Sequence, residues 1–362
     1  MIIFIVVIAV LVLAVYLFMQ QPLFGAKPTG KRLERMLASP HYKNGAFENL
    51  SHTPQLAEGA SMPKVMYEFF FNKSKRAAPA QPIPTVKHDL KNLSKDENIL
   101  FWFGHSSYFI QADGKTLLAD PVFSGNASPI GNVKAFKGSD AYTAEDMPEI
   151  DFLFLSHDHW DHLDYKTIKK LLPKVKRVIT GLGTGAHLER WGYNPNSITE
   201  LDWYESATLD GFTFIAQPAR HFSGRGFKRN GTLFISAVWQ TPSFRLYLGG
   251  DSGFDTHFEK IGTQYGPFDL VILECGQYNH AWHYIHMMPE ENITAARQLR
   301  AKMLLPVHWA KFSLALHDWD EPINRAVAEA EKQQQPIVTP IIGEKIYLDK
   351  VNTTPQWWRE LN

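Results

Sequence analysis

The sequence predicts one α/β domain behind an apolar N-terminal helix, on three observations. From Asn98 onward, short apolar runs bounded by Gly, Asp and Pro alternate with helix-like segments. No repeat or low-complexity tract divides this region. The first nineteen residues contain no charged or strongly polar side chain. We therefore expect a transmembrane anchor at 1–19, a juxtamembrane extension at 20–95, the main domain at 96–350 and a tail at 351–362.

The apolar segment 1–19 is long enough to span a bilayer, because a helix of this length at 1.5 Å per residue extends about 28 Å. A cleaved signal peptide and a buried core helix are the alternatives. A signal peptide carries basic residues before its apolar stretch, whereas none precedes it here and Gln20 follows directly. The basic residues between Lys27 and Arg35 predict a single-pass membrane protein with its main domain on the cytoplasmic side.

The extension at 20–95 is expected to be irregular apart from a helix near Lys31–Leu37, with an extended connector at Ala78–Pro84. Its aromatic stretch, Met66–Phe71, allows two interpretations. These side chains pack against the main domain, or they form an apolar surface that faces the bilayer.

Strands in the main domain are expected where an apolar run is bounded by turn residues. This pattern occurs at Ile99–Phe103, Tyr108–Gln111, Thr116–Ala119, Phe152–Ser156, Phe212–Gln217, Leu233–Trp239, Arg245–Gly249, Leu270–Glu274 and Met303–Val307. Helices are expected at Tyr165–Leu172, at Gly185–Trp191, from Pro289 onward and at Pro322–Lys332. Glu290 and Glu291 favour the third of these helices, because acidic residues in the first turn complement the helix dipole.

Composition narrows the classes of function. Basic and acidic residues are equal in number, 37 each, which removes the electrostatic argument for a nucleic-acid partner. The single cysteine, Cys275, excludes a disulfide within the chain and a cysteine-based zinc site. Any transition metal must therefore be held by histidine and carboxylate side chains, and the chain has 15 histidines.

The strongest motif follows an apolar strand and reads His157-Asp158-His159-Trp160-Asp161-His162. Imidazole and carboxylate groups are costly to bury unpaired, so packing alone does not explain this cluster. A tight turn leaving a strand projects alternate side chains to one side. His157 and His159 can therefore bind one metal, while the Asp-His pair at the end of the turn faces a second.

Three isolated residues lie where the remaining ligands of a two-metal site are needed. Each lies at the C-terminal end of a predicted strand, as a shared site at one edge of a sheet requires. They are His221, Asp251 and His308. Taken singly, each is more typical of a hydrogen-bonded or surface residue. Together with the turn at 157–162, they predict the complete ligand set.

In these motifs the chain resembles the metallo-β-lactamase superfamily, and more narrowly the family of phospholipases D that hydrolyse N-acylphosphatidylethanolamine. The resemblance rests on Phe103-Gly104-His105-Ser106-Ser107, Asp120-Pro121-Val122-Phe123-Ser124, the turn at 157–162, Gly249-Gly250-Asp251-Ser252, His286-Met287-Met288-Pro289-Glu290-Glu291 and His308-Trp309. The turn indicates the superfamily only, whereas the last two motifs favour the phospholipase. The segment Tyr278–Ile285 and the apolar N-terminus depart from the family's animal members.

The resemblance implies an αββα four-layer sandwich with two zinc ions at one edge, iron or manganese being alternatives. It assigns His157, His159 and His221 to the first metal, Asp161, His162 and His308 to the second, and Asp251 as a bridge. Two metal ions activate a water molecule near neutral pH for attack on phosphorus or an acyl carbon. Asp161 and His286 are the expected catalytic residues, with His286 and Tyr278 in contact with the substrate and His105 in a hydrogen-bonded supporting position.

The function expected from the resemblance is a membrane-tethered, zinc-dependent phosphodiesterase. It would hydrolyse N-acylphosphatidylethanolamine-like lipids to phosphatidic acid and N-acylethanolamine, with the bilayer as its partner. A lactonase or a phosphodiesterase for a soluble metabolite is the alternative within the same fold. A non-catalytic membrane scaffold is the alternative of another class, and the presence of all seven ligands disfavours it. A homodimer is left open.

Overall fold

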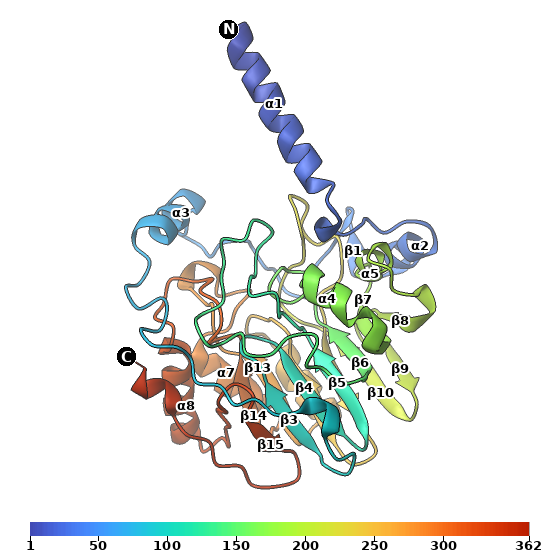
Figure 1. The fold of residues 1–362 in the computed structure, drawn as a ribbon, viewed down its shortest axis with the longest axis vertical. Helices are drawn as coiled ribbons and strands as arrows, with labels where there is room; N and C mark the ends of the chain where they lie inside the picture. Colours follow the sequence, from blue (N-terminus) through green and yellow to red (C-terminus); the bar gives the residue numbers. More distant parts are fainter. Residues whose placement is uncertain (362) are drawn as a thin grey trace.

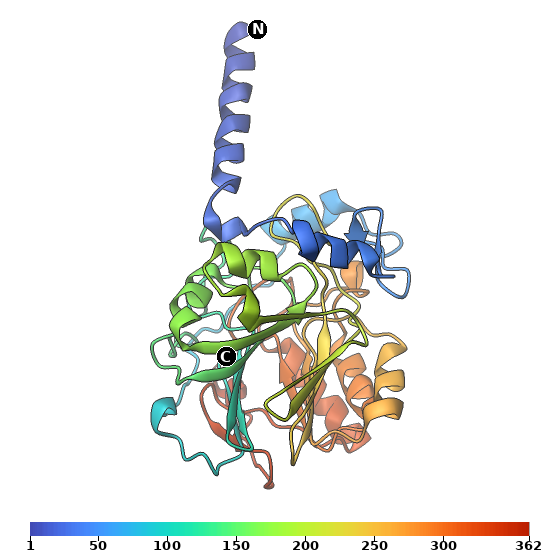
Figure 2. The same ribbon diagram turned by 90° about the vertical axis from the view of Figure 1, so that its right-hand side faces the viewer.

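Two β-sheets face each other at the centre of the molecule, with helices on their outer faces (Figures 1 and 2). The computed structural model describes residues 1–361. The N-terminal sheet has, in spatial order, β15 (Lys345–Tyr347), β3 (Ile99–Trp102), β4 (Tyr108–Ala112), β5 (Lys115–Ala119), β6 (Ile150–Leu155), β7 (Val175–Gly181) and β8 (Ile198–Leu201). The C-terminal sheet has β14 (Leu304–Val307), β13 (Leu270–Glu274), β12 (Arg245–Leu248), β11 (Ser236–Gln240), β10 (Phe212–Gln217) and β9 (Ser206–Leu209).

The side chains of β6 show how the layers are built. Phe152 and Phe154 belong to the core between the two sheets, where they meet the C-terminal sheet through residues such as Phe214. Leu153 and Leu155 belong to a second core on the outer face of the N-terminal sheet. Successive residues of a strand point to opposite faces, so a strand buried on both faces is continuously apolar. The predicted αββα sandwich is confirmed.

Helices cover both outer faces. The helices α4 (Tyr165–Leu171) and α5 (Gly185–Arg190) pack on the N-terminal sheet, and α6 (His257–Tyr265), α7 (Pro289–Gln298) and α8 (Glu321–Gln333) pack on the C-terminal sheet. Short 3-10 helices occupy Pro22–Phe24, Leu90–Asn92, Leu172–Lys174, Pro195–Ser197, His280–Trp282 and Trp357–Glu360. A small hairpin, β1 (Tyr42–Lys43) and β2 (Ala46–Phe47), lies in the extension.

The strand directions bring several loops to one edge of the sandwich. In the N-terminal sheet, β4 runs antiparallel to both β3 and β5, and β5 runs parallel to β6. In the C-terminal sheet, β12, β13 and β14 are parallel, and β10 shares their direction because β11 is antiparallel to both of its neighbours. The loops that follow β3, β5 and β6, and those that follow β10, β12, β13 and β14, therefore meet at the same sheet edges.

The predicted strands agree with the structure best where they are central. Phe212–Gln217 and Leu270–Glu274 have the predicted bounds. The strand predicted at Leu233–Trp239 begins later, at Ser236, because Leu233 and Ile235 donate their N–H groups to Leu182 and Ser156 in the opposite sheet's loops. Strands β7, β8, β9 and β15 and the helix α6 were not predicted.

The extension holds more structure than predicted. The helix α2 (Gly30–Ala38) confirms the one expected near Lys31–Leu37. The stretch expected to be irregular also contains α3 (Met62–Phe71), which Pro63 helps to start because its fixed φ suits the first turn. None of the residues of α3 is buried.

The apolar N-terminus forms α1 (Ile2–Met19), which projects from the body of the protein with no buried residue (Figure 1). Within residues 1–361, it is the one helix whose length and composition would allow it to cross a membrane. At the other end of the chain, Trp357 and Trp358 are buried and contact Trp309. The predicted tail at 351–362 is thus attached to the main domain through these two residues, whereas Val351 at its start is exposed.

Candidate metal centre

The structure brings all seven predicted ligands to one edge of the sandwich. The turn at 157–162 follows β6, and its backbone closes through the N–H groups of His162 and Leu163, which both donate to the carbonyl of His159. The isolated candidates follow β10, β12 and β14, as predicted; they are His221, Asp251 and His308. Five of the seven side chains are buried, and His159 and Asp161 are partly so.

Three imidazoles converge on one point. Nδ1 of His159 lies 2.9 Å from Nε2 of His157 and 3.3 Å from Nε2 of His221. Nitrogens this close to one another are typical of a shared cation, and this set matches the three-histidine sites that bind zinc. These residues are the ones expected to hold the first metal.

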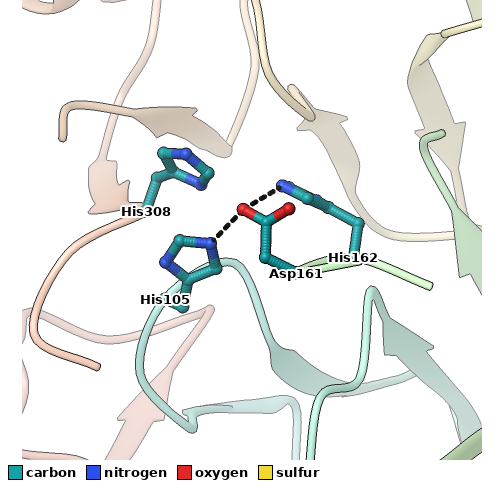
Figure 3. A group of neighbouring side chains, drawn as sticks. All are labelled: His105, Asp161, His162 and His308. Atoms are coloured by element: carbon teal, nitrogen blue, oxygen red, sulfur yellow. Dashed lines mark hydrogen bonds and ion pairs between the residues drawn. The ribbon is translucent and has the colours of Figure 1, made fainter. Parts of the chain in front are cut away.

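A second group, drawn in Figure 3, lies close to the first, because Asp251 is within 3.7 Å of a histidine of each. It contains Asp161, His162 and His308, together with His105 from the loop after β3. Oδ2 of Asp161 lies 2.8 Å from Nε2 of His105 and 3.6 Å from Nε2 of His162. His105 therefore contacts the ligand group itself, which agrees with the hydrogen-bonded position expected of it.

Asp251 lies between the two groups. Its Oδ2 is 3.1 Å from Nε2 of His162, 3.7 Å from Nε2 of His221 and 3.9 Å from Nε2 of His157. Its Oδ1 lies 3.2 Å from Nδ1 of His308. One carboxylate thus touches both groups, which is the position that a bridging ligand requires.

The ring nitrogens that face away from the cluster contact neighbouring groups, and these contacts set the orientation of the rings. Nδ1 of His221 donates to the carbonyl of Ile285 at 2.9 Å, so the Nε2 lone pair of the neutral ring faces the cluster. Nδ1 of His162 lies 2.9 Å from a carboxylate oxygen of Asp120. Such contacts orient imidazoles that bind metals. Asp120 was not predicted to have this role, although it belongs to a motif that carries the resemblance.

Several polar atoms of the cluster are buried and make no hydrogen bond of acceptable geometry; Nε2 of His162 and Oδ1 of Asp251 are among them, although other ligand atoms lie 3.1 and 3.2 Å away. Buried polar atoms are rarely left unsatisfied unless something else binds them. Nitrogen and carboxylate donors that converge in this way fit divalent transition-metal ions. The residues present therefore fit the metals that the fold implies.

The electrostatics agree with this fit. Burial, with smaller contributions from the neighbouring imidazoles, holds the pKa of both His157 and His221 well below the usual value, so these rings are neutral, as ligands must be. Burial also opposes protonation of His162, but the carboxylates of Asp251 and Asp161 outweigh it and raise its pKa well above the usual value. The centre of the cluster therefore stabilises positive charge.

Asp158, the one acidic residue of the turn outside the ligand set, points away from the cluster. Its carboxylate accepts hydrogen bonds from the N–H of Gly224 and from Nε2 of His187, at 2.6 and 3.1 Å. Burial opposes its ionisation, but the hydrogen bond from His187 and nearby positive charges lower its pKa to about 2. Asp158 thus holds the turn against the loop that follows His221.

His286 lies beside the cluster and is held by a residue that the sequence did not indicate. Its Nδ1 is 2.6 Å from Oε2 of Glu274, while Oε1 of Glu274 accepts the N–H groups of Met287 and Ser252. Burial raises the pKa of Glu274 well above its usual range. A protonated Glu274 donates to Nδ1 and leaves the ring's N–H on Nε2. The available signal was a glutamate that ends an otherwise apolar strand.

A cavity of about 270 Å³ opens over the cluster. Cluster residues in its wall are His159, Asp161, Asp251 and His308, and His286 lies beside them. Apolar groups from the extension and from later loops complete the wall; they include Leu56, Met62, Val65, Phe222, Trp282, Ile285 and Leu314. Arg229 is the one Lys or Arg side chain that lines it among residues 1–361.

The structure does not bring Tyr278 to this cavity. The hydroxyl of Tyr278 donates to Glu321 at 2.6 Å and accepts from Arg325 at 3.1 Å, and its ring stacks on His317. Its neighbour Gln277 lines the cavity instead. The structure therefore gives no support to the expected contact between Tyr278 and the substrate, and this side chain joins the loop to α8.

Purified protein should contain close to two divalent metal ions per chain. His308→Ala should lower this number toward one, because the second group loses a ligand while the three imidazoles of the first remain. Metal analysis by mass spectrometry of protein prepared without chelator measures both values. The half-buried His283, which belongs to neither ligand group, provides a matched control, since His283→Ala should leave the content unchanged. A wild-type content near zero would contradict the two-metal interpretation.

Comparisons with known proteins agree with this geometry. Residues 115–309 match the family described as the β-lactamase superfamily domain. An uncharacterised protein of Mycobacterium tuberculosis is 37% identical over 329 residues, covering 89% of this chain and 88% of that protein. An N-acyl-phosphatidylethanolamine-hydrolysing phospholipase D of Caenorhabditis elegans is 30% identical over 237 residues, covering 60% of this chain and 65% of that protein. A metallo hydrolase of Ignicoccus hospitalis has a similar fold, with a TM-score of 0.54 and 19% identity, over 69% of this chain and 97% of that one.

Proposed function

Since the chain belongs to the β-lactamase superfamily and is a metal-dependent hydrolase by fold, we propose that it is a membrane-tethered phospholipase D. Its substrates are N-acylphosphatidylethanolamine and related phospholipids, which it hydrolyses with water to phosphatidic acid and N-acylethanolamine. The likeness to the phospholipase D of Caenorhabditis elegans supports this choice.

One observation carries the proposal: the cavity over the cluster combines apolar walls with a single cation. Leu56, Val65 and Phe222 offer surface to acyl chains. The guanidinium of Arg229 lies 4.2 Å from the Phe222 ring centroid, and no carboxylate within residues 1–361 forms an ion pair with it. An anionic phosphodiester that carries apolar chains matches such a wall, whereas a neutral lactone leaves the cation without a partner.

The seven ligands would hold two zinc ions, which supply an activated water molecule at neutral pH and neutralise charge on the phosphate oxygens. The chain's own residues do the positioning. Nε2–H of His286 donates to a non-bridging phosphate oxygen, and Glu274 holds the ring in that tautomer. Arg229 binds the phosphate's charge and orients the diester. The apolar wall excludes bulk water, which strengthens each of these interactions.

The substrate is tested with full-length protein in vesicles that contain N-acylphosphatidylethanolamine, with products identified by mass spectrometry. We expect phosphatidic acid and N-acylethanolamine in equal amounts. Vesicles containing the parent phosphatidylethanolamine and a panel of water-soluble lactones are assayed alongside. Release of fatty acid in place of phosphatidic acid, or lactone turnover far above that of any lipid, would refute the proposed reaction.

The helix α1 serves as the membrane anchor in this proposal, with the main domain in the cytoplasm. Its mean hydropathy is 3.3, and apolar residues at a few tenths of a kcal/mol each make insertion favourable by several kcal/mol. Full-length protein should therefore stay in the membrane fraction after an alkaline wash, and a chain that begins at Lys27 should lack this integral attachment. A reporter fused to the C-terminus should behave as cytoplasmic; a translocated reporter would reverse the orientation.

A further inference from the structure

The end of α1 is joined to the metal-binding turn by a row of aromatic rings. Phe18, in the last turn of the helix, contacts Phe24 with ring centroids 5.2 Å apart, and Phe24 contacts Trp160 at the same distance. Trp160 lies within the turn at 157–162, between two of the candidate ligands. The direction in which α1 leaves the body is therefore fixed relative to the candidate metal centre.

Arg225 stabilises this junction between the segment after α1 and the turn at 157–162. Its guanidinium lies 3.9 Å from the ring centroid of Trp160 and donates two hydrogen bonds to the carbonyl of Leu23, at 3.0 and 2.8 Å. It also donates to the carbonyls of Asp158 and Leu163, which precede and follow Trp160 in the chain. Arg225 is buried, and a buried guanidinium with four such bonds gives a stiff contact.

Two exposed apolar segments lie at the end of the molecule from which α1 projects. One is α3, whose outward residues Tyr67, Phe70 and Phe71 are 58%, 67% and 73% exposed. Figures 1 and 2 both place α3 at this end. The other is the loop 224–230, whose tip, Phe227, is 85% exposed. This loop touches α1, because a Cβ on Gly226 would lie 3.0 Å from the methyl group of Met19.

The same two segments border the mouth of the cavity. Met62 and Val65, on the first turns of α3, line the cavity, and so does Arg229, in the loop that carries Phe227. The apolar groups exposed on these segments are therefore continuous with the route to the cluster. Large aromatic side chains left in water on both sides of one opening mark an interaction surface.

We infer that α3 and the tip of the loop 224–230 enter the lipid interface beside α1, so that the cavity opens onto the bilayer and takes its substrate from the membrane plane. The proposal extends the anchored phospholipase proposed above. The occupant is the bilayer, because the helix that would span it ends against this loop and its exit direction is fixed by Phe24 and Arg225. Lys64 and Lys228, exposed on the same two segments, suit an anionic lipid surface.

Site-directed fluorescence tests this contact without depending on catalysis. The one native cysteine, Cys275, is fully buried, so an introduced cysteine can be labelled selectively. Phe70→Cys and Phe227→Cys are labelled with an environment-sensitive bimane in full-length protein and reconstituted into vesicles. Vesicles of phosphatidylcholine and phosphatidylglycerol carry nitroxide groups on the acyl chains. Both labels should shift to the blue, and their emission should fall at least twofold through contact with the nitroxide.

Val351→Cys is the matched control, at a side chain that is 97% exposed. Val351 borders a surface with Asp269 and Met303, which precede β13 and β14, so it lies at the sheet edge opposite the cluster. Its label should stay unquenched. Water-like emission at positions 70 and 227 would overturn the inference. Shielding of these labels without quenching by the nitroxide would also overturn it, in favour of a protein partner. Lipid hydrolysis is assayed separately. The quenching result can therefore be interpreted even if the proposed substrate is wrong.

Discussion

Replacing Asp161 with asparagine is expected to lower kcat about 100-fold or more. Burial opposes the ionisation of this carboxylate, but His162 and the hydrogen bond from His105 together hold its pKa well below the usual range. Asp161 is therefore a fixed negative charge in the second ligand group. Asparagine keeps the shape and removes that charge. Loss of a residue that merely supports a metal ligand costs about 10–100-fold, and loss of a ligand should cost at least as much.

The measurement pairs kcat with metal content for the same preparation. We expect Asp161→Asn to lose activity and part of its second metal, while the first group keeps its own. Asp210→Asn serves as the matched control, because Asp210 is exposed and its nearest basic partner is Lys115, far along the sheet from the cluster. Asp161→Asn protein with activity within twofold of wild type would mean that Asp161 is not a ligand.

His286→Ala is expected to lower turnover by about 10–1000-fold while leaving the metal content intact. This range is typical of the loss of turnover when a hydrogen-bond donor aimed at charge in the transition state is removed. His286 lies beside the candidate ligands His221 and His308, with ring centroids 5.0 and 5.3 Å away, but belongs to neither metal group of the proposal. The loss should fall mainly on kcat, because the hydrogen bond strengthens as charge builds on the phosphate.

Variants of Glu274 test whether this residue acts by positioning the His286 ring. Glutamine at this position can still donate to Nδ1 of His286 and accept from the N–H of Met287, so Glu274→Gln should keep most of the activity. Glu274→Ala releases the ring and should approach the loss seen in His286→Ala. His283→Ala, which alters a half-buried imidazole close by in the chain, should stay within twofold of wild type. A fall in metal content in His286→Ala would contradict the assignment, since it would make His286 a ligand.

The secondary structure was predicted best for elements whose apolar sequence pattern matches their burial in the fold. The central strands are continuous apolar runs, so β10 and β13 were predicted with their bounds. The strand β7 was missed because Lys176 and Arg177 interrupt its start, and β9 because an exposed edge strand has no apolar pattern. The helix α3 was missed for a related reason: a helix with no buried face shows no periodicity that points to a core.

The residues of the candidate site also fall into two groups, those that the sequence predicted and those that it did not. The turn at 157–162 and the residues after β10, β12 and β14 could be recognised because ligand types at strand ends form a pattern. Their supports could not. Asp120 and Glu274 reach the site from other strand ends, and Arg225 reaches it from a distant loop, so each acts across a fold that spacing does not reveal. Tyr278 was expected at the substrate because its segment departs from the family's animal members, but its side chain contacts Glu321 and Arg325 of α8.

The packing of Trp357 and Trp358 against Trp309 has a consequence for the order in which the protein matures. Trp309 follows the candidate ligand His308, and these indoles lie in one buried group. Synthesis proceeds from the N-terminus, and folding accompanies it. The turn at 157–162 therefore leaves the ribosome long before the tryptophans that brace His308. Until those late residues arrive, the chain has most of its ligands but an unbraced second group. The apolar N-terminal helix thus has most of translation to reach its destination before the metal centre is complete.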